Sequence, residues 1–286
     1  MKRYKKESGG TLVVGQVFYN RRFVMKIDRG LCKGCEICKI ICPREAVSLK
    51  IPDSGPAVVD IDENKCDFHG ICAAVCPFSA IKLYIDDREQ IPVLKKSVFP
   101  HLNRDISIDG TKCKPGCKQC EEACPLHVIS VDMSRPAKTG NSVYVQEDLC
   151  AGCRACWREC PTDALEVSKF IEGTIKINED KCLEGCGRCV GACPLGALSV
   201  DASGKVVADD GICIYCGACH AVCPAEGALD IRRTAIRHSG VESGAWNKGL
   251  EKLTSSDGLN KELAASRADK ARAAVQKLND GAECNA

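Results

Sequence analysis

Residues 32–43 read CKGCEICKIICP, four closely spaced cysteines followed directly by a proline. The same pattern returns five more times along the chain, so one short motif accounts for nearly all of the cysteines. Such an internal repeat indicates one structural unit used several times. The other copies are CDFHGICAAVCP from 66, CKPGCKQCEEACP from 113, CAGCRACWRECP from 150, CLEGCGRCVGACP from 182 and CIYCGACHAVCP from 213.

Composition and charge narrow the class of protein. Of 286 residues 24 are cysteine and only 5% are aromatic, so the usual large core-filling side chains are scarce. The net charge of +2 gives no electrostatic reason to expect nucleic acid or a membrane surface as partner. We see no secretory signal and no apolar run of membrane-spanning length, and we predict a cytoplasmic protein. Abundant cysteine in a reducing compartment indicates metal or redox chemistry.

The spacing of the cysteines favours iron–sulfur clusters. Three cysteines on a tight loop can direct three thiolates at one [4Fe–4S] cube, and in two-cluster ferredoxins the fourth cysteine of each motif ligates the other cluster. A zinc ribbon would separate two C-x2-C pairs by about 12 to 20 residues, and a disulfide scaffold is expected in a far shorter secreted chain. We therefore predict about six [4Fe–4S] clusters. Because buried thiolates need a compensating cation, metal binding and folding should be coupled.

The residues after each motif predict the fold class. The proline either ends the ligand loop or starts a short helix at its first position. Short apolar segments typical of strands follow: AVSLKI, AIKLYI, VISV, ALEV, ALSV and ALDI. We expect an α+β protein of three tandem two-[4Fe–4S] ferredoxin-type domains with short strands and helices, plus a helical C-terminal extension.

The distances between motifs suggest how they pair. The longest stretch between motifs runs from Cys76 to Cys113 and marks the clearest boundary. The stretch from Cys160 to Cys182 resembles those within pairs, so motifs four and five could instead pair as an insertion between three and six. With sequential pairing, we expect an N-terminal extension at 1–20, ferredoxin domains at 21–98, 99–172 and 173–235, and a docking extension with a C-terminal helix at 236–286.

Exchange of the fourth cysteine within each pair gives six predicted ligand sets, and we predict no catalytic residue. Cys284 is left over and should be an unligated thiol. The sets are Cys32, Cys35, Cys38 and Cys76; Cys66, His69, Cys72 and Cys42; Cys113, Cys117, Cys120 and Cys160; Cys150, Cys153, Cys156 and Cys124; Cys182, Cys186, Cys189 and Cys223; and Cys213, Cys216, Cys219 and Cys193.

The second motif has a histidine in place of a cysteine. His69 aligns with Cys35, Cys153 and Cys216. Imidazole can replace thiolate on an iron–sulfur centre, where the neutral donor raises the reduction potential. We predict that His69 ligates the second cluster. Two alternatives stay open: Asp67 binds through its carboxylate, or the site holds a three-iron [3Fe–4S] cluster.

Two further features are interpreted from sequence alone. In ELAASRADKARAAVQKL (262–278), the small apolar residues share one helical face, which we expect to lie on another subunit or across the chain's own domains. The alternative is a solvated tail. The remaining histidines stand singly, and we interpret them as surface or packing residues: His101, His127, His220 and His238.

Three segments resemble a known family. They read GLCKGCEICKIICPREAV (30–47), PVLKKSVFPHLNRDISID (92–109) and GALDIRRTAIRHSGVESGAWNKGLEKLT (227–254). The chain from about 20 to 280 resembles archaeal polyferredoxins, and more narrowly the polyferredoxin subunit of formylmethanofuran dehydrogenase. Six motifs are fewer than that family carries. The resemblance implies electron transport to or from a tungsten or molybdenum pterin site on other subunits, where CO2 is reduced to formylmethanofuran in methanogenesis or the reverse.

The resemblance also implies partners. A heterodisulfide reductase, hydrogenase or formate dehydrogenase would supply the electrons, and this chain would not be catalytic by itself. The main alternative is a free polyferredoxin that carries electrons between such partners. We interpret IRHSGVESGAWNKGLEKLT (236–254) as a docking segment, which favours the subunit over the carrier. A catalytic radical or dehydratase cluster would need an open iron, which only the second motif could offer.

Overall fold

The computed structural model describes residues 2–132, 142–241 and 243–255. Two features predicted from the sequence, the C-terminal helix at 262–278 and the thiol of Cys284, lie outside the described residues.

Each motif forms a loop, one short helix and a turn. The helix contains the third cysteine and ends before the fourth. In the first motif, for example, α1 contains Cys38 and ends one residue before Cys42. The proline after the fourth cysteine therefore lies in the turn beyond the helix, so our alternative that it starts a helix is wrong. The motif helices are α1 (Ile37–Ile41), α2 (Ile71–Ala74), α4 (Gln119–Glu122), α5 (Ala155–Arg158), α6 (Arg188–Ala192) and α7 (Ala218–Val222).

Strand pairing groups the motifs two by two. The strand before the first motif of each pair lies antiparallel to the strand after the second: β3 (Arg22–Asp28) with β6 (Ile81–Ile85), β8 (Ile106–Ile108) with β11 (Leu165–Val167), and β12 (Ile171–Ile177) with β15 (Leu229–Ile236). The two strands between the motifs also pair: β4 (Val47–Lys50) with β5 (Val58–Ile61), β9 (Ile129–Asp132) with β10 (Ser142–Val145), and β13 (Leu198–Val200) with β14 (Val206–Ala208).

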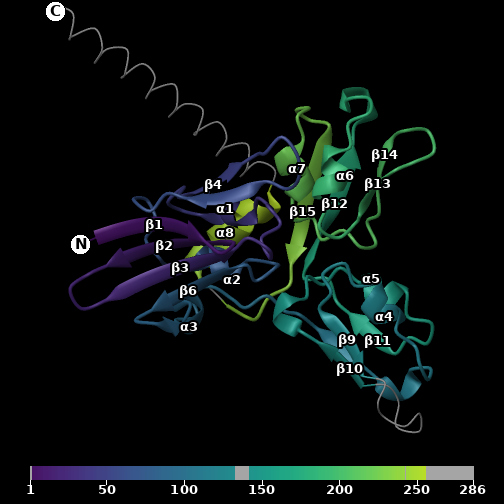
Figure 1. Cartoon of the computed structure of the whole chain (residues 1–286), viewed down its shortest axis with the longest axis horizontal. Coiled ribbons are helices and arrows are strands. Elements are labelled where there is room, and N and C mark those ends of the chain that lie inside the picture. Colours follow the sequence, from purple (N-terminus) through teal and green to yellow (C-terminus); the bar gives the residue numbers. More distant parts are fainter. Residues whose placement is uncertain (1, 133–141, 242, 256–286) are drawn as a thin grey trace, which may run out of the picture.

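These pairings define three similar units. We call them unit 1 (22–85), unit 2 (106–167) and unit 3 (171–236). The six short strands expected after the prolines are all present, as β4, β6, β9, β11, β13 and β15. Figure 1 shows unit 1 beside the N-terminus, unit 2 around α4 and α5, and unit 3 around α6 and α7.

The N-terminal residues enlarge the sheet of unit 1. Strands β1 (Lys2–Ser8) and β2 (Thr11–Val17) extend the pair of β3 and β6 into a five-stranded antiparallel sheet, in the order β1-β2-β3-β6-β7, with β7 at Arg88–Glu89. Leu12 and Val14 on β2 and Ile27 on β3 point to the core and are buried. The residues expected as a separate N-terminal extension thus contribute strands to unit 1.

Helix α8 (Gly244–Thr254) brings the chain back from unit 3 to unit 1. It contacts both α1 and β15. Ser243 caps its first turn by accepting a hydrogen bond from the amide of Trp246 at 3.0 Å. The indole of Trp246, 1% exposed, lies edge-on to Phe99 with ring centroids 5.6 Å apart and donates to His238 Nε2 at 3.2 Å. The segment expected to dock onto a partner therefore packs within its own chain.

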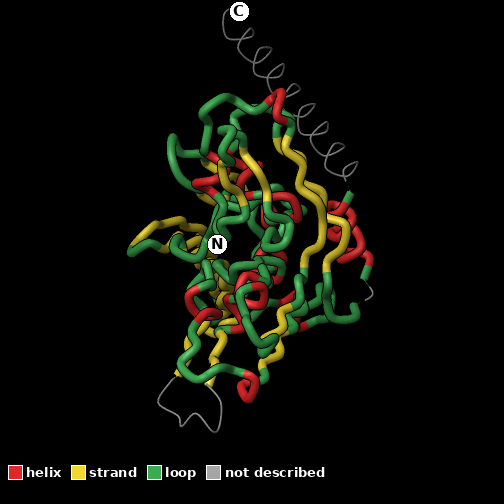
Figure 2. Tube along the Cα trace, turned by 90° about the vertical axis from the view of Figure 1, so that its right-hand side faces the viewer, coloured by secondary structure: helices red, strands yellow, loops and turns green. Residues whose placement is uncertain are grey.

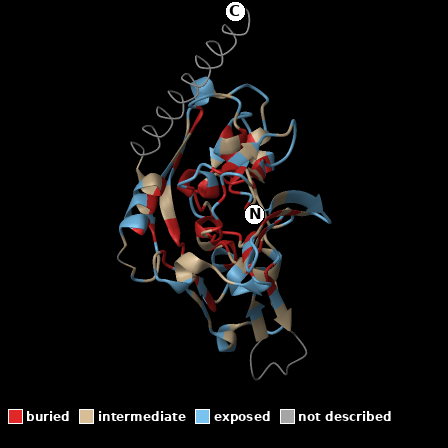
Figure 3. Cartoon of the chain, turned by 90° about the vertical axis from the view of Figure 1, so that its left-hand side faces the viewer, coloured by how far each residue is buried: buried red, intermediate tan, exposed pale blue. Residues whose placement is uncertain are grey.

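Only short elements complete the described part. They are α3 (Pro92–Lys95) and the 3₁₀ turns Gly110–Lys112, Glu147–Leu149 and Glu179–Lys181, which precede motifs three, four and five. Loops make up much of the trace (Figure 2), and the buried residues gather mostly in the middle of the molecule (Figure 3). Among the described helices, none has both the length and the apolar character needed to cross a bilayer.

We predict that Trp246→Ala lowers the free energy of unfolding of the iron-loaded protein by about 3–5 kcal/mol, because it empties a buried aromatic site between units. Denaturant titration under anaerobic conditions measures this. The chain's other tryptophan is the matched control: Trp157 is 37% exposed, so Trp157→Ala should cost about 1 kcal/mol or less. If both variants lowered the free energy of unfolding equally, the conclusion that α8 packs between units 1 and 3 and stabilises the protein would be contradicted.

Candidate iron–sulfur centres

Three of the predicted ligand sets line pockets of their own. The pockets are otherwise apolar: Ile108 and Leu165 line the first, Ile177 and Val206 the second, and Ile175 the third. Their cysteines are Cys113, Cys117, Cys120 and Cys160 (site 3); Cys182, Cys186, Cys189 and Cys223 (site 5); and Cys193, Cys213, Cys216 and Cys219 (site 6).

The cysteines of the other sets are also neighbours. After burial, the main influence that raises the pKa of their thiols is the proximity of other cysteines. Around Cys38 these are Cys72, from the neighbouring set, and then Cys76 and Cys32, which with Cys35 we call site 1. Around Cys72 they are Cys66 and Cys42, which we call site 2 and for which His69 is the predicted fourth ligand. Around Cys156 they are Cys153, Cys150 and Cys124, which we call site 4.

The chemistry of these donors fits an iron–sulfur cluster. All described cysteines are free thiols. Burial raises the pKa of Cys38 well above its usual value and that of Cys216 to about 12, so without a cation both stay protonated at neutral pH. Ligation must therefore release protons. Within the described residues no three His, Cys, Asp or Glu side chains converge tightly enough to hold a single metal ion. Soft thiolates spread around apolar pockets suit a multi-iron cluster.

After five of the six motifs, the turn presents an amide donor to the fourth cysteine; at the sixth, the amide of Ala228 donates to the carbonyl of Ala225 instead. In unit 1, Ser79 adopts a left-handed conformation (φ 48°), which turns the chain so that the amide of Ala80 donates to Cys76 Sγ at 3.4 Å. Such donors favour the thiolate and raise the potential of a bound cluster. The same contact joins Ala46 to Cys42 and Val128 to Cys124 (3.4 Å each), and Ala164 to Cys160 and Ala197 to Cys193 (3.3 Å each).

The loop of His69 keeps the geometry of its cysteine counterparts. Cys35, Cys153 and Cys216 each accept a hydrogen bond from the amide two residues further on. His69 Nδ1 likewise accepts from the amide of Ile71 at 3.2 Å. Burial lowers the pKa of His69, which favours the neutral ring that binds metals. Because the Nδ1 lone pair is engaged, ligation through Nε2 requires a proton on Nδ1 and a turn of the ring away from Ile71.

Asp67, the alternative ligand at site 2, has another partner. Its carboxylate pairs with Arg44 Nε at 2.9 Å on the surface. This contact holds the carboxylate of Asp67 on Arg44 and so disfavours a ligand role for Asp67. The effect is small, because an exposed ion pair is weak.

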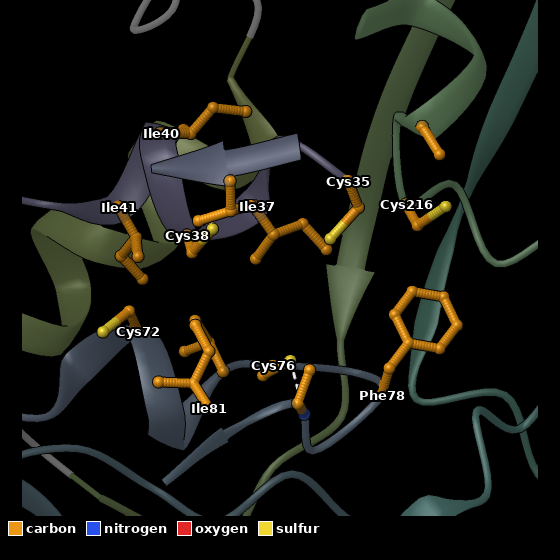
Figure 4. Packing of buried hydrophobic residues seen from close by; sticks show 14 of the residues in the cluster. Cys35, Ile37, Cys38, Ile40, Ile41, Cys72, Cys76, Phe78, Ile81 and Cys216 are labelled. Carbon is orange, nitrogen blue, oxygen red and sulfur yellow. Dashed lines mark hydrogen bonds between the residues drawn. The ribbon is translucent and has the colours of Figure 1, made fainter. Parts of the chain in front are cut away.

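The sites are not arranged in chain order. Cys38 of site 1 neighbours Cys72 of site 2, as expected within one unit. Cys35 of site 1 also neighbours Cys216 of site 6 across the boundary between units 1 and 3, and Figure 4 shows the two residues near each other with their sulfur atoms pointing apart. This proximity carried no signal in the sequence, because it depends on how the units dock.

A partly buried ion-pair network lies at this boundary, with Arg233 buried and His220 exposed. Glu36, next to Cys35, accepts from His220 Nδ1 at 3.0 Å and from Arg233 Nη2 at 3.4 Å. Burial disfavours its charged form, but His220 and Arg233 lower the pKa of Glu36 overall. A Cβ atom at Gly217 would lie 2.7 Å from the carboxylate, so only glycine allows this approach. His220, interpreted from sequence as a surface or packing residue, thus joins a contact between units.

Comparisons with known proteins agree with this geometry. The sequence profile of the 4Fe-4S dicluster domain matches residues 31–80, 112–164 and 181–228, one match per unit. A second profile of the same description matches 142–194, which spans motifs four and five.

Individual relatives are also polyferredoxins or parts of redox complexes. The chain is 35% identical to polyferredoxin MvhB of Methanothermus fervidus over 34% of its own length and 24% of that protein. It is 36% identical to the polyferredoxin-like subunit of an aliphatic sulfonate oxidoreductase from Pyrococcus furiosus, over 39% and 65% of the respective lengths. Each match thus spans less than two thirds of the relative.

A solved structure matches much more of the chain. It is a chain of the formate dehydrogenase, heterodisulfide reductase and formylmethanofuran dehydrogenase complex from Methanospirillum hungatei. The two share 30% identity with a TM-score of 0.80, over 88% of this chain and 91% of the other.

We predict that anaerobic removal of iron by a chelator unfolds the protein. The buried thiols then lose the cation that holds each set together, and the motif helices are too short to stand alone. Far-ultraviolet circular dichroism should lose most of its helix and strand signal and regain it on reconstitution with iron and sulfide. Chelator presaturated with iron is the control. A metal-free protein with an unchanged spectrum and thermal transition would contradict the coupling.

Proposed function

Because the chain belongs to the 4Fe-4S dicluster domain family, which covers more than half of it, we propose that it relays electrons through six iron–sulfur sites. The observation that supports this proposal is that the described cysteines lie in groups, with Cys38 of site 1 near Cys72 of site 2 and Cys35 of site 1 near Cys216 of site 6. A [4Fe–4S] cluster supplies one-electron storage with little change in geometry.

The protein's own residues prepare each site for this role. They hold the sulfurs in fixed loops, exclude water and set the electrostatic surroundings. Cys35 and Cys38 are about 5% exposed, which keeps site 1 away from solvent and from adventitious oxidants. We propose the six ligand sets predicted from sequence, including His69 at site 2.

We further propose that the partners are the catalytic subunits of a tungsten or molybdenum formylmethanofuran dehydrogenase. The chain of the M. hungatei complex supports this, because the alignment covers nearly all of both chains. Electrons would reach this chain from a formate dehydrogenase, heterodisulfide reductase or hydrogenase. The free carrier remains the second candidate, favoured by the likeness to MvhB. The packing of α8 within the chain removes one argument against it.

Purification from native anaerobic cells separates the two candidates. As a subunit, a tagged chain should copurify with tungsten or molybdenum in a fixed ratio that survives a high-salt wash and gel filtration. The physical reason is that a permanent interface buries more apolar area than a transient one. A monomer free of both metals would support the carrier and contradict the subunit proposal.

Site 2 can be tested by substitution. Loaded protein should contain about 24 iron and about 24 sulfide per chain. We predict that His69→Ala leaves one corner of site 2 without a protein ligand, so that air-free mild oxidation yields the electron paramagnetic resonance (EPR) signal of one [3Fe–4S] centre per chain. Asp67→Asn is the control and should give no such signal. The signal in wild-type protein, or in Asp67→Asn alone, would contradict ligation by His69.

A further inference from the structure

An arginine lies between site 1 and site 4. Arg104 belongs to the connection from unit 1 to unit 2, and its guanidinium reaches both units. It donates to the carbonyl oxygen of Cys150 and, at 3.4 Å, to that of Cys76. It also donates to Ser79 Oγ at 3.3 Å and to the carbonyl of Glu147 at 3.4 Å. One side chain thus contacts the backbone of a ligand cysteine in each of two sites.

Among the described residues, the charge of Arg104 has no carboxylate in ion-pair contact. Its hydrogen-bond acceptors are three carbonyls and a hydroxyl, and its flat face lies over the ring of Phe170 at 5.3 Å. The acid that influences its pKa is Asp148, an exposed residue. Burial lowers the pKa of Arg104, while Cys150, Cys76 and Asp148, in that order, favour its charged form.

The boundary between sites 1 and 6 is built differently. Arg233 there also contacts the backbone of a ligand cysteine, donating to the carbonyl of Cys216 at 3.2 Å. Its charge, however, is matched by the carboxylate of Glu36 at 3.4 Å. The two boundaries around site 1 therefore differ, because the carboxylate of Glu36 contacts Arg233 whereas Arg104 pairs with none of the described acids.

We propose that Arg104 is a positioning residue whose unmatched charge stabilises the reduced forms of sites 1 and 4 and so favours electron passage between units 1 and 2. This inference rests on the proposed function, since it requires clusters at both sites. A positive charge close to a cluster lowers the energy of the added electron and raises the reduction potential. The effect is partial, because Arg104 also lines an open cleft with Cys76 and Asp148, where salt screens it.

The contact between the units does not depend on Arg104 alone. The hydroxyl of Ser79 also donates to the backbone carbonyl of Asp148 in unit 2. Further along, Arg158 of unit 2 pairs with Asp209 of unit 3. A variant that removes only the charge of Arg104 can therefore keep the units in place, which makes the electrostatic role separable from a structural one.

The test compares Arg104→Gln, which removes the charge, with Arg104→Lys, which keeps it. Each full chain is loaded with iron and titrated anaerobically in a spectroelectrochemical cell, with electrons counted per chain and spin coupling followed by EPR. We expect two of the six sites to shift to more negative potential in Arg104→Gln, and that shift to be at least halved in Arg104→Lys. Raised salt should shrink the difference between wild type and Arg104→Gln.

The control is Arg22→Gln. Arg22, the first residue of β3, pairs with Asp87, and both side chains are exposed, so this variant makes the same change in net charge and should titrate like the wild type. If Arg104→Gln does not load iron, Arg104→Met replaces it as the variant without the charge. Two results overturn the inference: a titration of the neutral variant identical to wild type, or equal shifts in the Lys and Gln variants, which would indicate lost packing. Wild-type protein that binds no clusters would instead refute the proposed function.

Discussion

The charge of the thiolates around each pocket is the constraint on which the structure depends. The protein scaffold around them is small. The motif helices have four or five residues, and in the described part of the chain five of the six sheets have two strands, sizes that are marginal in water. Much of the core around the sites consists of cysteine and small residues such as Ala151, Ala218 and Ala228. A cationic inorganic centre therefore has to supply the cohesion that aromatic side chains give elsewhere, which explains why so few are present. Unit 1 departs from this, because β1 and β2 add a conventional apolar sheet.

The features that the sequence could predict are those that depend on local spacing. The strands after the prolines and the loops follow from residues close together in the chain. The sequence left the pairing of motifs three to six open, and the strand pairs β8 with β11 and β12 with β15 group them in sequential order. The helix that contains the third cysteine also depends on nearby residues. The proline did not predict its position, because the proline follows the fourth cysteine, after the helix has ended. The alternation in β2, where Leu12, Val14 and Gln16 are buried, also indicates a strand. Ser243 likewise indicates the start of a helix, because serine is a favoured N-terminal cap. The meeting of Cys35 with Cys216 had no such signal, since it arises only when units 1 and 3 dock.

Polar residues at the boundaries acquire their roles only through this docking. Glu36, His220 and Arg104 look ordinary in the sequence, yet each joins two units beside a site. The arginines contact backbone carbonyls of ligand cysteines, so a shift of one unit against another would also shift ligand loops. The boundaries thus fix both the distance between sites and the charge around them, which are the two quantities that govern electron passage.

The position of Phe170 shows how closely the units converge. Its ring is fully buried beneath Arg104, lies within 3.1 Å of where a Cβ of Gly152 in the site 4 loop would be, and its carbonyl accepts from the amide of Arg237 at 2.8 Å. Three units therefore meet around site 1, while the loops of sites 3 and 5 are more exposed, with Leu183 of site 5 54% exposed. A carrier with one partner at a time needs a single accessible site. An arrangement with a buried centre and several accessible ends is better suited to a conduit that serves different partners at once.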